Sequence, residues 1–215
     1  MQAQTSLIFR CYPSSFISAI GYLLLALSFL SGCSNPRWYF GVGGKYNEAT
    51  IELTRPRGGN IDKAIGNLES VVTQDPTYRD SLTLLGRAYY KRGRYQDAYL
   101  IAQRALTVNK EDEIAWLVLG LTQLRLGEDE KGLETLKGGL TLFNKVNGSG
   151  YRGYQYWDRA GKVRIAIRRA VIVALKGLEE KDSLIKSVEN VFAAWDEEEF
   201  FRRFEQAAER EREYQ

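Results

Sequence analysis

The residue types that most often carry catalysis and metal binding are scarce in this chain. It has no histidine, which removes the commonest general base and the commonest metal ligand. Its two cysteines, Cys11 and Cys33, lie near the start, so neither can build a thiolate site in a folded domain further along. The acidic clusters at 111–113 and 128–130 fall between expected helices, as solvated turns do. The sequence therefore predicts a protein that is not an enzyme and binds no cofactor or metal.

Cys33 ends an N-terminal segment of distinct composition. Residues 1–32 contain no acidic residue and a single arginine, and the run 16–30 is apolar. This run is shorter than the roughly 20 residues that a membrane-spanning helix needs, and it has the length of a secretory signal. It closes on Leu30-Ser31-Gly32-Cys33, which resembles the lipobox of bacterial lipoproteins. The alternative is an uncleaved N-terminal anchor helix.

The lipobox resemblance implies an export signal and a lipid anchor. Residues 1–32 would be a signal peptide with Leu30, Ser31 and Gly32 in its cleavage motif, and Cys33 would carry the acyl chains. The residue after the cysteine is Ser34 rather than aspartate, which by the same resemblance favours the outer membrane. The expected localisation is the cell envelope, lipid-anchored on the periplasmic face of the bacterial outer membrane.

The next segment is expected to connect this anchor to the helices. Residues 33–60 are rich in glycine and proline, which predicts a tether with a poorly formed helix around 46–54. From Ile61 apolar residues recur with the spacing of an amphipathic helix. These apolar residues are Ile61, Ala64, Ile65, Leu68, Val71 and Val72, and the helix is expected to end near Asp75-Pro76.

An internal repeat then decides the fold class. Leu82-x-x-Leu85-Gly86-x-x-Tyr89 is followed, 34 residues later, by Trp116-x-x-Leu119-Gly120-x-x-Gln123. The motif resembles the tetratricopeptide repeat (TPR) family. The resemblance implies an all-α fold, with a TPR-like helical-hairpin solenoid of about two and a half repeats at 61–146 and three C-terminal helices packing on it. Gly86 and Gly120 are expected where helices cross closely. Generic helical hairpins are the alternative.

Residues 147–215 form the predicted C-terminal helical region. A loop rich in glycine and aromatic residues at 147–158 precedes helices expected at about 157–178, 183–195 and 197–213, with Asp196 capping the last. The first of these is apolar nearly all round, so we expect it to be buried on both sides, including Ile165, Ile172 and Leu175. Its basic cluster is either a solvated face paired with residues 197–199, or a site for an acidic partner or anionic lipid headgroups.

In the TPR family the first helix of each hairpin lines a groove. The resemblance places Arg87, Tyr90 and Lys91 there from one repeat, and Leu117, Leu121 and Leu124 from the next. An exposed aliphatic strip is costly, so the groove is filled either by a partner helix or by the chain's own C-terminal helices. The spare helices favour the second. The remaining open surface would then be Arg87, Tyr90, Lys91 and the loop aromatics Tyr151, Tyr154 and Trp157.

The function predicted from these features is a non-catalytic, membrane-anchored TPR lipoprotein that serves as a protein–protein interaction scaffold in a cell-envelope assembly. Its partners would be envelope proteins and the membrane, the latter through the lipid on Cys33. A net charge of +3 is too small to argue for nucleic acid. The alternative is a glycan-binding or peptidoglycan-associated module that uses Tyr151, Tyr154, Tyr156 and Trp157.

Overall fold

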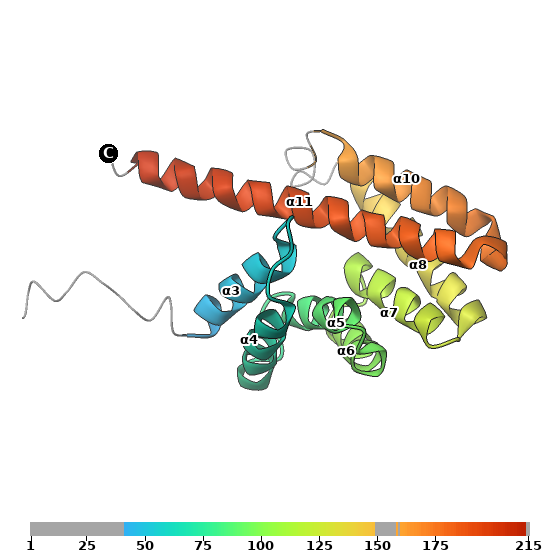
Figure 1. Ribbon diagram of the computed structural model, residues 1–215, viewed down its shortest axis with the longest axis horizontal. Helices are drawn as coiled ribbons and strands as arrows, with labels where there is room; N and C mark the ends of the chain where they lie inside the picture. Colours follow the sequence, from blue (N-terminus) through green and yellow to red (C-terminus); the bar gives the residue numbers. More distant parts are fainter. Residues whose placement is uncertain (1–40, 149–157, 159, 214–215) are drawn as a thin grey trace, which may run out of the picture. The chain divides into compact units, whose positions relative to one another are not determined.

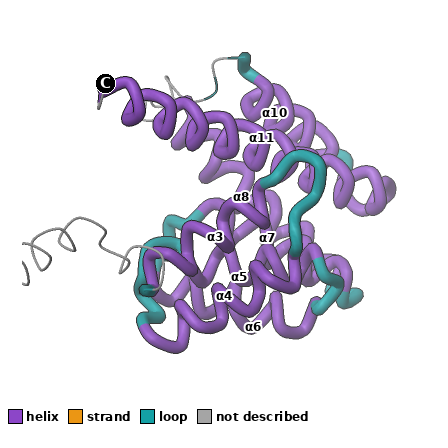
Figure 2. Tube along the Cα trace, turned by 60° about the vertical axis from the view of Figure 1, so that its left-hand side comes forward, coloured by secondary structure: helices purple, strands orange, loops and turns teal. Residues whose placement is uncertain are grey.

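The chain folds into helices that pair in sequence as antiparallel hairpins (Figures 1 and 2). The computed structural model describes residues 41–148, 158 and 160–213. Its helices are α3 (Val42–Thr54), α4 (Ile61–Gln74), α5 (Ser81–Lys91), α6 (Tyr95–Val108), α7 (Glu113–Arg125), α8 (Asp129–Gly148), α10 (Lys162–Leu175), the short 3-10 helix η1 (Gly177–Glu180) and α11 (Lys181–Glu213). The predicted all-α, TPR-like fold is confirmed.

The turns inside the second and third hairpins repeat the same backbone conformation. Gly93 and Gly127 both have a left-handed φ, of 79° and 86°. The amide after each glycine bonds a carbonyl of the preceding helix, Arg94 N to Tyr89 O and Glu128 N to Gln123 O, both at 2.9 Å. This is the bond pattern of a Schellman helix end, which needs a residue that tolerates positive φ. The sequence repeat therefore corresponds to a repeat of structure.

The first hairpin is more complete than the sequence predicted. The expected tether over 33–60 contains α3, which packs on α4 and buries Tyr46, Ala49 and Leu53. The α3 sequence hides this face because Thr50 and Thr54 are also buried, where their hydroxyls bond the carbonyls four residues back. The solenoid thus has three hairpins rather than two and a half. Of the six apolar residues expected on its face, α4 buries five, and Ile61 is partly buried.

The two glycines expected at close helix crossings differ. A Cβ at Gly120 would lie 2.7 Å from the Leu136 Cγ atom of α8, so only a hydrogen fits there. A Cβ at Gly86 would make an ordinary 3.5 Å contact with Val118. The prediction is confirmed for Gly120 and wrong for Gly86, where α5 and α7 leave room for a methyl group.

The C-terminal region also departs from the predicted helix boundaries. The helices expected at 183–195 and 197–213 are one continuous helix, α11, and Asp196 lies in its interior instead of capping a new start. The carboxylate of Asp196 binds cationic side chains of α5 rather than backbone amides. The chain after α8 therefore forms two long helices joined by η1, with α8 reaching Gly148, inside the segment expected as a loop.

Helix α10 is buried on one side only. Its inward face, Val163, Ile167, Ala170 and Ala174, packs on α8 and α11. The expectation that Ile165, Ile172 and Leu175 are also buried is wrong, because they are 50%, 60% and 74% exposed. Within residues 41–148 and 160–213, no helix combines the length and apolar character that crossing a bilayer requires.

Candidate functional site

The surface where a TPR-type groove is expected is covered by the chain's own helix α11. This helix contacts the first helix of all three hairpins, α3, α5 and α7, which come from distant parts of the sequence (Figures 1 and 2). The C-terminal helices therefore pack on the solenoid as expected, and α11 does so through polar side chains. The groove side chains Arg87, Tyr90, Lys91 and Arg125 all bind residues of α11.

A buried charge cluster joins α5 to α11. The Arg87 guanidinium pairs with the Asp196 carboxylate, and their side chains are only 2% and 8% exposed. The same guanidinium lies over the Phe192 ring, 5.0 Å from its centroid. The second Asp196 oxygen accepts a hydrogen bond from the Lys91 ammonium at 2.7 Å. One carboxylate thus pairs with two cations, which leaves the cluster with a net positive charge, and these pairs orient α11 on α5.

Lys91 stands where three helices meet. Besides pairing with Asp196, its ammonium donates to the Leu53 carbonyl at the end of α3, at 2.9 Å. This bond satisfies a helix-terminal acceptor that would otherwise lack a partner. Burial lowers the pKa of Lys91 and the nearby Arg87 charge lowers it further, while Asp196 opposes both effects. Asp196 is therefore the group that offsets the effect of burial on this ammonium.

A second polar cluster lies beside the first. The Tyr90 hydroxyl donates to a Glu189 carboxylate oxygen at 2.7 Å, and Arg125 of α7 binds the same oxygen at 2.9 Å. Burial raises the pKa of Tyr90, and so does its bond to Glu189, so the hydroxyl stays protonated and remains a donor. Glu189 therefore links α5, α7 and α11.

An open cleft of about 590 Å³ lies next to these two clusters. Its walls combine aromatic rings with ionised groups and belong to the α3–α4 turn, α5, the start of α6 and α11. The lining includes Arg55, Tyr90, Lys91, Tyr95, Glu189, Phe192, Ala193 and Asp196. Tyr90 and Tyr95 lie with their ring centroids 5.5 Å apart. A cleft of this volume with a few convergent polar groups is the usual form of a binding site.

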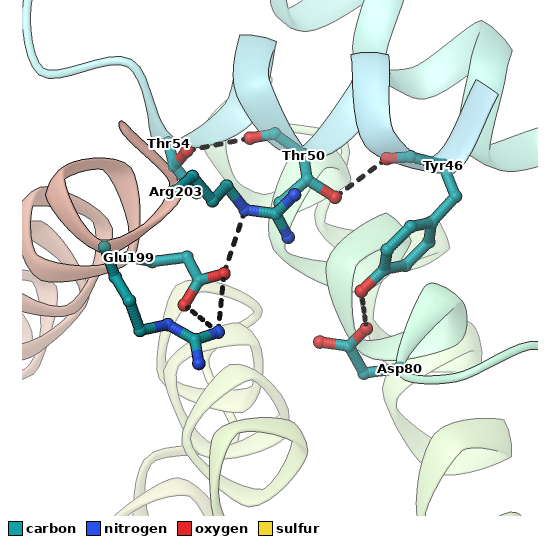
Figure 3. A network of polar contacts seen from close by, with 7 residues as sticks. Tyr46, Thr50, Thr54, Asp80, Glu199 and Arg203 are labelled. Carbon is teal, nitrogen blue, oxygen red and sulfur yellow. Dashed lines mark hydrogen bonds and ion pairs between the residues drawn. The ribbon is translucent and has the colours of Figure 1, made fainter. Parts of the chain in front are cut away.

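Polar contacts also fix the α3 side of the cleft. Figure 3 shows Tyr46 of α3 pointing to Asp80, just before α5, and its hydroxyl bonds that carboxylate at 2.5 Å. On α11, Glu199 accepts from Arg203 at 2.9 Å, one helical turn away and close to the end of α3. Burial and Asp80 raise the pKa of Tyr46, so its hydroxyl stays a donor. The Tyr46–Asp80 bond thus ties α3 to the start of α5, whereas the Glu199–Arg203 bond lies within α11.

The predicted binding residues fall into three groups in the structure. Arg87 and Tyr90 are buried, so the expectation that they form an open surface is wrong for these two, whereas Lys91 is exposed and lines the cleft. They lie in the contact with α11, where Glu189 and Asp196 bind them. The predicted residues Cys33, Leu30, Ser31, Gly32, Tyr151, Tyr154 and Trp157 lie outside the described residues.

The three predicted groove leucines are fully buried. Leu117 and Leu124 lie against Gly139 and Gly132 of α8, where an added Cβ would come within 3.2 Å and 2.8 Å of them, and Leu121 is 0% exposed. Leu117 and Leu124 therefore pack within the α7–α8 hairpin.

Sequence reasoning missed the two acidic residues of α11 that organise the site. Glu189 and Asp196 are seven residues apart, so they lie about two turns apart on one helix face, and that spacing was visible in the sequence. What the sequence does not show is which cations they meet. Among the described residues no cluster of three or more Cys, Asp or Glu side chains is placed to hold a metal ion.

Comparison with known proteins supports the repeat assignment. The family model described as "Anaphase-promoting complex, cyclosome, subunit 3" matches residues 58–139, from the start of the α4 segment into α8. This is a TPR-like repeat family, a class that is typically non-catalytic and binds proteins, and the match covers less than half of the chain. No curated protein matches the chain significantly. The described helices and this similarity together identify a TPR-like helical-repeat protein.

Proposed function

We propose that this chain is a non-catalytic scaffold that holds partner proteins at a membrane of the cell envelope. Lipid on Cys33 anchors it, and the cleft between the α3–α4 turn, α5 and α11 receives a segment of the partner. TPR-like repeats point to protein partners in general. The anchor and the envelope location rest on the sequence of residues 1–33 alone.

The observation that carries the binding proposal is the composition of the 590 Å³ cleft. Protein interfaces are enriched in tyrosine, phenylalanine and arginine at their centres, and Tyr95, Phe192 and Arg55 line this cleft. Lys91 and Glu189 place one cation and one anion in the walls, which suits a partner segment with polar backbone groups and mixed charge. The long groove itself is filled by α11, so the cleft is where this face stays open.

Site-specific photocrosslinking tests the binding site. A photoreactive amino acid replaces Ala193, which is exposed on α11 and lines the cleft, in full chains produced in the native organism. The matched control places it at Leu100, 62% exposed on α6 and not part of the cleft. The proposal expects one discrete protein adduct from position 193 that is absent at 100. Equal adducts from both positions, or none at 193, would contradict it.

A separate experiment tests the anchor. Cys33→Ala should move the chain from the membrane fraction to the soluble fraction and abolish metabolic labelling by a palmitate analogue, because the acylated thiol is gone. Ser34→Ala is the control and should leave both unchanged. If Cys33→Ala stays in the membrane and the wild type carries no label, the lipid anchor is wrong while the cleft proposal stands.

A further inference from the structure

The outward side of α10 has an unusual composition. We call Ile165, Arg168, Arg169, Ile172, Leu175 and Lys176 the α10 outer face. Its aliphatic members Ile165, Ile172 and Leu175 are 50%, 60% and 74% exposed. Folded chains rarely leave several neighbouring large aliphatic side chains exposed to this extent. Isoleucine is only a moderate helix former, so local helix stability does not account for Ile165 and Ile172. The α10 outer face therefore needs another explanation.

The geometry places the aliphatic residues at the point furthest from the core. Ile165 and Ile172 are about two turns apart on one line, on the opposite side of the helix from buried Val163 and Ala170. Arg168 with Leu175 flanks this line on one side, and Arg169 with Lys176 flanks it on the other. In an ordinary surface helix the outermost line is polar. Here it is aliphatic with cations along both edges.

The charge of α10 is one-sided. The helix carries no acidic residue. Lys162 pairs with Glu197, which confirms part of the expected pairing with residues 197–199, and Arg164 pairs with Asp158. Lys176 pairs with Glu180, whereas neither Arg168 nor Arg169 forms an ion pair with any residue that the structure describes. Beside them a shallow hollow of about 280 Å³ is lined by Lys162, Arg169, Ser187 and Asn190 together with Ile165 and Ala166. It offers donors suited to an anionic oxygen.

We propose that the α10 outer face docks on a bilayer that contains anionic phospholipids. Ile165, Ile172 and Leu175 enter the boundary between headgroups and acyl chains. The aliphatic parts of the arginine side chains on both edges extend toward the headgroup layer, where the guanidinium groups bind phosphates. Headgroup phosphates are the anions that this row of cations attracts at a membrane surface.

The shape of this face favours a bilayer over a protein partner. Among the described elements α10 packs on α8, α11 and η1. The line of Ile165 and Ile172 lies opposite the buried Val163 and Ala170 and forms a ridge, and the hollow beside Arg169 lies at its α11 edge. Figures 1 and 2 both show no described helix over this side of α10. A partner helix needs a groove to bury its apolar side, whereas a flat and deformable headgroup layer accepts a ridge. A second copy of this face would bring arginines against arginines.

This inference goes beyond the proposed scaffold function and does not depend on lipid at Cys33. The test therefore uses full-length chains with Cys33→Ser, which removes that acylation site in every sample. Vesicles are made from equal parts phosphatidylglycerol and phosphatidylcholine, or from phosphatidylcholine alone. Flotation measures binding, and hydrogen exchange over 162–176 locates the contact. The apolar N-terminal segment is the same in all samples.

We expect the chain to bind the anionic vesicles and the exchange of α10 amides to slow on binding. On vesicles of phosphatidylcholine alone we expect neither binding through α10 nor slowed exchange in α10. Arg168→Ala with Arg169→Ala should weaken the anionic binding about 30-fold. Ile172→Asp should weaken it about tenfold or more, because an aliphatic side chain no longer enters the bilayer. The control Arg104→Ala with Lys110→Ala removes two exposed cations elsewhere and should retain α10 protection. Thermal unfolding confirms that each variant is folded.

Three outcomes would overturn the proposal. Exchange in α10 that is the same with and without anionic vesicles shows that this face does not touch lipid. Equal loss of binding in the control pair shows that total charge, not the α10 outer face, attracts the vesicle. If soluble polyglutamate slows hydrogen exchange in α10 and vesicles do not, the α10 outer face binds an acidic protein instead of a bilayer. Each result leaves the Cys33 and cleft experiments unaffected.

Discussion

At the scale of single residues, Asp196 is the group on which the contact between α11 and α5 depends most. Asp196→Asn keeps the shape but leaves Arg87 buried without its anion and weakens the hold on Lys91. Breaking a buried pair on one side costs about 3–5 kcal/mol, and the partial exposure of Lys91 favours the lower end. Urea unfolding should therefore give a free energy of unfolding about 3 kcal/mol smaller than in the wild type.

The control for this prediction is Glu180→Gln. It breaks the Lys176–Glu180 pair, whose side chains are about half exposed, and exposed pairs contribute little. A loss below about 0.5 kcal/mol is expected there. If Asp196→Asn lost no more than this control, the buried cluster would not be what holds α11.

Asp112, which caps α7, makes a prediction about pH. Its carboxylate accepts hydrogen bonds from the Ala115 amide and the Thr83 hydroxyl, yet burial outweighs these and raises its pKa above 3.8. The folded chain thus holds this proton more tightly than the unfolded chain, so the ionised group lowers stability at neutral pH. That cost disappears as the pH falls through the folded pKa to below the unfolded value.

Asp112→Asn measures this effect, because asparagine caps a helix equally well and its amide can donate to Thr83. The free energy of unfolding of the variant minus that of the wild type should be largest near neutral pH and should shrink toward about pH 3. Glu134→Gln, an exposed carboxylate of α8, supplies the baseline. A difference that stays constant with pH, or grows in acid, would show that burial does not govern this cap.

At the scale of elements, two adjacent glycines of α8 should respond in opposite ways. A Cβ at Gly139 would lie 2.8 Å from the Trp116 Cβ atom, so Gly139→Ala should destabilise the α7–α8 hairpin by about 1–3 kcal/mol. Gly138 has nothing within 4 Å, so Gly138→Ala should stabilise the helix by about 0.5–1 kcal/mol. Thermal unfolding of both variants checks the pair, and a shift of the same sign in both would refute the packing argument.

The same scale shows what the sequence predicts well. The helix α4 with most of its buried face and the close crossing at Gly120 follow from local spacing, because a helix face is fixed within a few residues. Helix α3 was harder, since two of its buried positions are threonines that look polar. Local patterns therefore predicted the elements better where their buried residues are apolar.

The candidate site was less predictable because its contacts are distant in sequence. Asp196 and Arg87 are 109 residues apart, so the acid that resembles a helix cap is instead a partner for a groove arginine. The exposure of the α10 outer face was hard to predict for the same reason, because it depends on elements that are distant in sequence. Periodicity shows that both sides of α10 are apolar, but not how many neighbours are available to cover them.

At the scale of the whole molecule, α11 is what makes the described helices one structure. It contacts α10 along its first half, α8 through the Trp195–Phe143 edge contact, and the first helices of the three hairpins. Three stacked hairpins are near the minimum for a stable repeat array, so the long helix supplies burial that further repeats would provide in a longer solenoid.

This arrangement predicts that α11 unfolds together with the repeats. Leu184, Val188 and Val191 are 0% exposed and belong to the same hydrophobic core as α10 and the repeats, and Asp196 pairs with buried Arg87 of α5. Native-state hydrogen exchange should therefore give the amides of 184–196 the same opening free energy as those of α7, equal to that of global unfolding. The matched comparison is Asp196→Asn, which should lower both values equally. If 184–196 instead opened at a clearly lower free energy, with α7 still protected, the groove would open in the native state and a partner segment would compete with α11 for it.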